Sequence, residues 1–125
     1  MQYIGEIDID KFKNISNDIA TNEVIITDER IKHIQERHPK DYERFSKYIP
    51  QIIKDPDYII EANKPKTAVI LKNIVEDDKH FQLIIRLKTS DEPAEYKNSI
   101  ITFLRIYKKD WERIIKNKKV LYKKE

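Results

Sequence analysis

Three long β-type segments follow one another in the second half of the chain, and they constrain the fold more than any other feature. Residues 67–74 (TAVILKNI), 81–88 (FQLIIRLK) and 98–107 (NSIITFLRIY) are rich in aliphatic and β-branched residues, which favour strands. The connections between them, 75–80 and 89–97, are polar. Successive strands joined by polar connections pair with their neighbours in sequence, so the pattern predicts an antiparallel meander.

Two short strands and a helix are predicted before this meander. Residues 3–9 alternate between apolar and acidic side chains, and residues 23–27 (EVIIT) are mostly β-branched, so each segment is typical of a strand. Thr27 is a favourable helix N-cap. Pro39 disfavours helical geometry at the residue before it, so a helix should cover residues 28–38.

Further helical periodicity lies at 41–55 and 109–117, and Pro50 should kink the first of these segments or start a new helix. Residues 58–62 are a candidate short strand. The predicted fold class is α+β, with N-terminal helices packed on an antiparallel β-sheet meander and a C-terminal helix. A length of 125 residues fits a single domain, 1–125.

The net charge of +3 is spread unevenly along the chain. Residues 105–125 carry nine Lys or Arg and three acids, a net +6, which leaves −3 on the first 104 residues. A basic end of this kind favours contact with a polyanion such as RNA, although a solvated helix followed by a tail has the same composition. No apolar run approaches the roughly 18 residues of a membrane helix, so we expect a cytoplasmic protein without a membrane partner.

The residues needed for several common chemistries are missing. The chain has no cysteine, and its three histidines show neither HxH nor HxxxH spacing, so we expect no metal site and no cofactor. Gly5 is the only glycine, which excludes a glycine-rich phosphate loop. There is also no GxSxG motif. These exclusions leave acid–base chemistry by histidine, supported by cations.

His38 is the strongest catalytic candidate among the histidines. In a helix it lies about 40° from Ile34 and about 20° from Ile31, on the buried edge of the predicted helix. It also lies at the C-terminal end, where the helix dipole stabilises an imidazolium. A histidine that caps the last carbonyl groups has the same pattern. His33 lies about 140° from His38, and we interpret it as a surface residue.

Polar residues inside the predicted strands form a second group of candidates. Arg86 shares a strand face with Gln82, Thr102 lies in the middle of an apolar strand, and Lys72 lies near the end of its strand. Each has a structural alternative, because threonine suits strands and an edge lysine can extend its charge to water. We predict that Arg86 and Thr102 lie in one pocket, provided that the register holds, because a slip of one residue reverses the faces.

An ordered set of segments resembles a known family. ITDERIKHIQERHP, IPQIIKDPDYI, TAVILK, FQLIIRLK and NSIITFLRI occur in this order over most of the chain. Together they resemble the phage branch of the barnase–EndoU–colicin–RelE (BECR) superfamily of nuclease-like domains. The resemblance implies a small α+β domain that cleaves RNA without a metal ion. In that reaction the ribose 2′-OH attacks the adjacent phosphate and a cyclic phosphate results.

The resemblance also places His38, in the RHP triplet, as the motif histidine. The candidate site therefore comprises six residues that could move protons or hold phosphate charge: catalytic His38, Arg86 and Thr102, and substrate-binding Lys72, Arg105 and Arg37. A histidine–glutamate pair is not evident, because Glu36 lies about 160° from His38 around the helix.

Two functions remain open from the sequence. The first is a ribonuclease domain of a mobile element that acts on RNA as a toxin or effector, with an immunity or antitoxin protein as its partner. The alternative is a non-catalytic RNA-binding or protein-interaction module on the same fold, such as a phage accessory protein.

Overall fold

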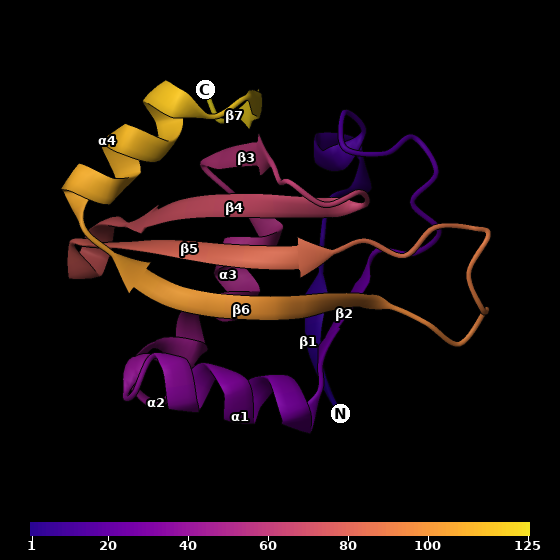
Figure 1. The fold of residues 1–125 in the computed structure, drawn as a ribbon, viewed down its shortest axis with the longest axis horizontal. Helices are drawn as coiled ribbons and strands as arrows, with labels where there is room; N and C mark the ends of the chain where they lie inside the picture. Colours follow the sequence, from indigo (N-terminus) through magenta and orange to yellow (C-terminus); the bar gives the residue numbers. More distant parts are fainter.

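The computed structural model describes residues 1–125 and is built around a seven-stranded mixed sheet (Figure 1). In chain order the strands are β1 (Gln2–Glu6), β2 (Glu23–Ile26), β3 (Tyr58–Glu61), β4 (Thr67–Ile74), β5 (Lys79–Arg86), β6 (Asn98–Ile106) and β7 (Val120–Lys123). Their order in the sheet is β1-β2-β6-β5-β4-β3-β7. The α+β class and the β4–β5–β6 meander are confirmed. The parallel pairing of β2 with β6 is one departure from the antiparallel sheet that was predicted.

The α-helices are α1 (Asp28–Arg37), α2 (Asp41–Phe45), α3 (Ile49–Lys54) and α4 (Lys108–Asn117). Short 3-10 turns lie at Ile9–Phe12, Ser46–Tyr48 and Val75–Asp77. Thr27 caps α1 as predicted, because its hydroxyl oxygen accepts a hydrogen bond from the Arg30 N–H at 3.2 Å. The predicted 41–55 helix is divided into α2 and α3, with Pro50 in the first turn of α3. None of the helices has the length and apolarity needed to cross a membrane.

The main core lies on one face of the sheet, between the strands and helices α1 to α3. Every second side chain of β4 and β5 points to this covered face, and those in the core are Ala68, Ile70, Ile74, Phe81, Leu83 and Ile85. They belong to the same buried cluster as Ile34 of α1, Phe45 of α2 and Ile52 of α3. Burying each large aliphatic or aromatic side chain stabilises the fold by about 1.5–3 kcal/mol. The alternate residues of the same strands therefore point to the opposite face.

Helix α4 covers only part of that opposite face. Its apolar side, formed by Trp111, Ile114 and Ile115, packs in a second core cluster with Leu71 of β4 and Ile106 of β6. In Figure 1, α4 lies along one margin of the sheet and α1 along the other, with β4, β5 and β6 between them. We call the uncovered part of this surface the open face; its residues include Thr67, Val69, Gln82, Ile84, Arg86, Ser99 and Ile101.

The basic C-terminal segment forms an edge strand. Residues 120–123 pair antiparallel with β3, and Lys123 stands opposite Tyr58. The side-chain amide of Asn14 donates a hydrogen bond to the Leu121 carbonyl oxygen at 3.2 Å. The basic end that was predicted from charge is thus a packed helix and strand, and its lysines stand on a fixed surface.

Candidate nucleic-acid groove

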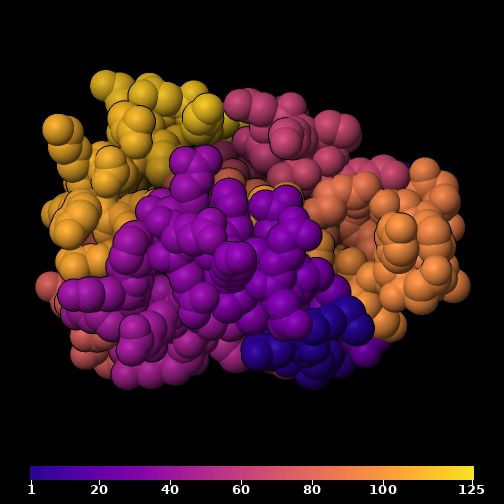
Figure 2. Space-filling model, turned by 60° about the horizontal axis from the view of Figure 1, so that its bottom comes forward, coloured from indigo at the N-terminus to yellow at the C-terminus, as the bar shows by residue number.

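Two adjoining hollows lie on the open face. The first, of about 350 Å³, has mainly aliphatic walls, and we call it the apolar pocket. The second, of about 570 Å³, is lined by Arg30, Lys64, Lys66 and Arg86, and we call it the cationic pocket. Both are lined by Lys64, Thr67 and Ile101, so they form one continuous open-face groove. In Figure 2 the α1 region, in purple, lies in front, with α4 in yellow and the β3–β4 turn in pink behind it.

A bulge in β6 turns Thr102 toward the open face. Thr102 pairs with Ile84, while Ile100 pairs with the next residue of β5, so Ile101 is an extra residue between them. Side chains alternate strictly in a regular strand, and Thr102 would then share the covered face with Ile100. The bulge gives Thr102 and Arg86 the same face on neighbouring strands. Thr102 is nevertheless not among the residues that line either pocket.

Three cations of the groove have no partner within the chain. Arg30 projects from α1, Lys64 from the β3–β4 turn and Lys118 from the end of α4, and the side chain of each lines a pocket without a hydrogen bond or ion pair. Cations that are exposed and unpaired keep their attraction for an added anion, because no internal carboxylate must first be displaced. The groove therefore presents free positive charge along its length.

Arg86 is engaged by the β5–β6 loop at one end of the groove. Its guanidinium donates to both carboxylate oxygens of Glu92, at 3.1 and 2.8 Å, and also to the Leu87 carbonyl oxygen. The Arg86 guanidinium, with the Thr89 backbone N–H, lowers the pKa of Glu92 to about 2. Lys66 is held in the same way by Asp91, at 3.1 Å. These two cations line the cationic pocket but already have carboxylate partners.

Helix α1 carries a histidine close to Arg30. The helix packs beside β6, and Arg30 already reaches the cationic pocket. His33 is half-buried and lies about 60° from Arg30 around the helix and about 4.5 Å further along it, although it lines neither pocket. Arg37 lies about 20° from Arg30 around the helix, about two turns further on, and is exposed.

His38 lies at the C-cap of α1, as predicted, but at the opposite end of β6 from Arg86. Its carbonyl oxygen accepts a hydrogen bond from the Asp41 N–H at 3.1 Å, and the Asp41 carboxylate accepts one from the Arg105 N–H at 3.1 Å. Arg86, by contrast, pairs with Ser99. Six residues of β6 separate these two positions, roughly 20 Å along the strand. The structure therefore does not bring His38 together with Arg86.

Two of the predicted substrate-binding cations belong to the covered face. Lys72 is nearly buried, and its ammonium lies 3.2 Å from carboxylate oxygens of both Asp55 and Asp57. Arg105 stands opposite a core residue of β5, and its guanidinium lies 4.5 Å from the centre of the Tyr107 ring. Neither residue lines the groove. The predicted residues are thus not gathered in one site: Arg86 and Thr102 share the open face, Lys72 and Arg105 the covered face, and Arg37 and His38 lie at the end of α1. No group of three His, Cys, Asp or Glu side chains is placed to hold a metal ion.

One known protein family matches nearly the whole chain. The family model described as phage-Barnase-EndoU-ColicinE5/D-RelE like nuclease 2, or PBECR2, matches residues 1–123. The chain belongs to the PBECR2 family. This match confirms the resemblance to the phage BECR branch and makes the chain a nuclease-like domain of that kind. No curated protein and no solved structure matches the chain.

Several side chains in and near the open-face groove of this PBECR2 domain are of types that act in phosphate chemistry. The groove combines free cations with Ser99 of β6, and the half-buried His33 lies within one turn of Arg30 on α1. These are the groups that neutralise phosphate charge and transfer protons. The sequence carried one signal for this arrangement: Arg30, His33 and Arg37 recur at intervals of three and four residues, the spacing of one helix flank.

Proposed function

We propose that this chain is a metal-independent endoribonuclease that holds single-stranded RNA in the open-face groove. The observation that carries the proposal is the presence, in a nuclease-like domain, of three unpaired groove cations: Arg30, Lys64 and Lys118. Each one that neutralises a phosphate releases counterions, so RNA should bind in a salt-dependent manner. Single strands suit the groove because their backbone and bases are both accessible.

The proposed reaction is transesterification by the ribose 2′-hydroxyl. A base removes the 2′-OH proton, the O2′–P bond forms, the P–O5′ bond breaks, and an acid returns a proton to O5′. The protein must move these protons and stabilise the negative charge on phosphorus. We assign the proton transfer to His33, because it lies within one turn of Arg30, the α1 residue that lines the cationic pocket. Ser99, which lines the cationic pocket, would supply a hydroxyl contact to the phosphate from β6.

In this proposal Arg86 and His38 have supporting roles. Arg86 fixes the β5–β6 loop through Glu92 and so shapes one end of the groove. His38 ends α1 and lies beside the Asp41–Arg105 contact, which holds the helix junction against β6. Arg37 extends the positive charge of the α1 flank.

The test is cleavage of labelled RNA in the presence of EDTA. His33→Ala should lower cleavage by about two to four orders of magnitude, the usual contribution of a general acid or base. His38→Ala is the matched control on the same helix and should retain most of the activity. A substrate with a single 2′-deoxy sugar at the cut position should be inert. Cleavage of that substrate, or activity that requires Mg²⁺, would refute the mechanism.

A second candidate is a non-catalytic RNA-binding module. It is favoured by the fact that neither histidine of the α1 region has a carboxylate within salt-bridge distance, so no orienting partner is present. Salt-sensitive RNA binding without any cleavage would support it over the nuclease.

We also propose a toxin or effector role that depends on this activity, with an immunity or antitoxin protein as partner. Induced expression of the parent chain should arrest bacterial growth, whereas the His33→Ala chain should not. Equal toxicity of the two chains would argue against a role for cleavage.

A further inference from the structure

We infer that the apolar pocket accepts one unstacked nucleobase of the bound RNA strand. This inference rests on the proposed RNA substrate and adds a site that reads the base. The cavity of about 350 Å³ falls in the size range of pockets that hold small organic ligands, which begins at about 300 Å³. Because the pocket adjoins the cationic pocket, a base held there stays linked to a phosphate in the groove.

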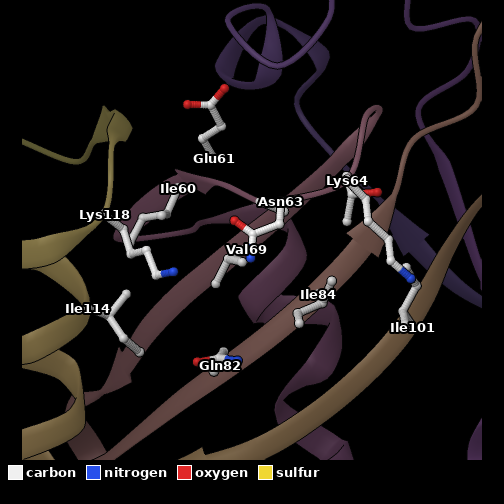
Figure 3. Close-up of a pocket in the computed structure, with 12 residues that line it drawn as sticks. Ile60, Glu61, Asn63, Lys64, Val69, Gln82, Ile84, Ile101, Ile114 and Lys118 are labelled. Carbon is white, nitrogen blue, oxygen red and sulfur yellow. The ribbon is translucent and has the colours of Figure 1, made fainter.

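The floor and walls of the pocket fit a flat apolar surface. They are built from aliphatic side chains of four strands and one helix, as Figure 3 shows: Ile60, Val69, Ile84, Ile101 and Ile114. Side chains that stand on a pleated sheet form an even surface, against which the face of a base can lie. A base that leaves solvent for this surface gains stability from the apolar area that both partners bury.

Two amide side chains give the pocket hydrogen-bonding groups that an alkyl ligand could not use. Gln82 and Asn63 line it, and neither side chain makes a hydrogen bond within the chain. Each amide offers both a donor and an acceptor, which matches the mixed donors and acceptors on the edge of a nucleobase. A purely aliphatic ligand would cover these groups without pairing them, at a cost in free energy.

The charges around the pocket favour a nucleotide over an uncharged ring. In Figure 3 the Lys118 side chain enters from the α4 side and Lys64 lies on the side of Ile101, whereas the Glu61 carboxylate points away from the other labelled side chains. Lys64 and Lys118 have no ion-pair partner, so they can contact the phosphates on either side of the inserted base. Paired bases of a duplex remain stacked and could not enter, so the site requires a single strand.

Mononucleotides test this site without requiring cleavage. The four nucleoside 5′-monophosphates and ribose 5-phosphate are titrated into the full chain, and two-dimensional NMR follows the Gln82 amide and the isoleucine methyl groups. The nucleotides should shift the signals of Gln82 and Ile84, while ribose 5-phosphate should shift only signals near the lysines. Identical shifts with both kinds of ligand, or nucleotide shifts centred away from this pocket, would overturn the inference.

A matched pair of variants measures the contribution of the amide. Gln82→Leu keeps the size and apolar character of the side chain but removes its hydrogen-bonding groups, so nucleotide affinity should fall by about tenfold or more. Gln51→Leu makes the same change on an exposed residue of α3 and should leave the affinity unchanged. Equal affinity of the two variants would overturn the role of Gln82, and thermal melting verifies that both are folded.

The outcomes separate this inference from the proposed reaction. If nucleotides bind in the pocket but the chain does not cleave RNA, the base site is supported and the nuclease activity is rejected. Metal-independent cleavage that Gln82→Leu leaves unchanged in rate and in base preference would reject the base site and retain the nuclease. A peptide with aliphatic side chains that displaces the nucleotide and binds more tightly would identify the pocket as a protein contact and overturn the inference.

Discussion

Both faces of the central sheet carry lysines, but the lysine of the covered face is buried and paired, whereas two of the open face are exposed and unpaired. On the covered face the Lys72 ammonium is nearly buried and contacts Asp55 and Asp57, each at 3.2 Å. On the open face Lys64 and Lys118 are exposed and have no carboxylate partner. A buried charge must be paired for the chain to fold, whereas an exposed one is stabilised by water. Binding of an added anion is therefore expected on the open face.

Lys124, near the C-terminal end of the chain, adds another ammonium group to the cluster of Lys72, Asp55 and Asp57. Its ammonium lies 2.6 Å from the Asp55 carboxylate, and the Lys124 contact is the main cause of the lowered pKa of Asp55. The backbone N–H of Lys124 also donates to the Asp57 carbonyl oxygen at 2.8 Å. The cluster thus joins the C-terminal end of the chain to the turn that follows α3, which indicates a role in stability.

The largest effect on stability is expected from breaking this cluster. Lys72→Met keeps an unbranched side chain but leaves two carboxylates near a core position with one cation fewer. The free energy of unfolding should fall by about 3 kcal/mol, at the low end for a buried pair because both aspartates are partly exposed. Chemical denaturation measures it. RNA affinity of the folded variant should not change, and a specific loss of binding would place Lys72 in the RNA site after all.

Most of the fold was predictable because its pattern is local. Alternation placed β4 correctly and β5 and β6 to within two residues, and Thr27 and Pro39 placed the ends of α1. β7 could not be predicted, because a four-residue strand between lysines becomes a strand only through its pairing with β3. The parallel pairing of β2 with β6 joins segments more than seventy residues apart, and no local signal specifies it.

The candidate site was less predictable for a geometric reason. Helix periodicity identified the buried edge of α1 and therefore favoured His38, but the α1 residue that lines the groove is Arg30, at the opposite end of the helix. The bulge at Ile101 decides the face of Thr102, and residue types alone do not reveal a bulge. Lys72 looked like a candidate because its aspartate partners lie elsewhere in the chain.

The next largest effect should come from removing the free cations. Replacing Arg30, Lys64 and Lys118 together with glutamine should lower the slope of log affinity against log salt by about 2, since each phosphate contact contributes about 0.7 for single strands. At 0.1 M salt this corresponds to about 100-fold weaker binding. Fluorescence titration with a labelled oligonucleotide at several salt concentrations measures the slope.

A matched triple variant on the outer surface provides the control. Lys13, Lys32 and Lys54 are exposed and line none of the groove, so their replacement by glutamine makes the same change in net charge. The slope should then change much less. If both triple variants reduce the slope equally, binding depends on total charge and the distinction between the faces has no functional meaning.

The smallest effect is expected at Arg86. This residue lines the groove, as the unpaired cations do, but its guanidinium is paired with a carboxylate, that of Glu92. The pKa of Glu92 in the folded chain, about 2, lies below its ordinary value of 4.5. Its ionised form is therefore favoured by folding, and this stabilisation is complete above about pH 4.5 and lost as the pH falls toward 2. Glu92→Gln should remove this part of the acid sensitivity and lower the unfolding free energy near neutral pH by about 1 kcal/mol.

The same variant should change RNA binding in the opposite direction. Without the Glu92 carboxylate the Arg86 guanidinium becomes a fourth free cation of the groove, so the salt slope should rise by up to about 0.7. Glu95→Gln in the same loop removes a carboxylate that makes no ion pair and should alter neither stability nor slope. A fall in RNA affinity on Glu92→Gln would mean that the ordered loop itself contacts RNA, and the pairing of Arg86 would then serve the groove by positioning that loop.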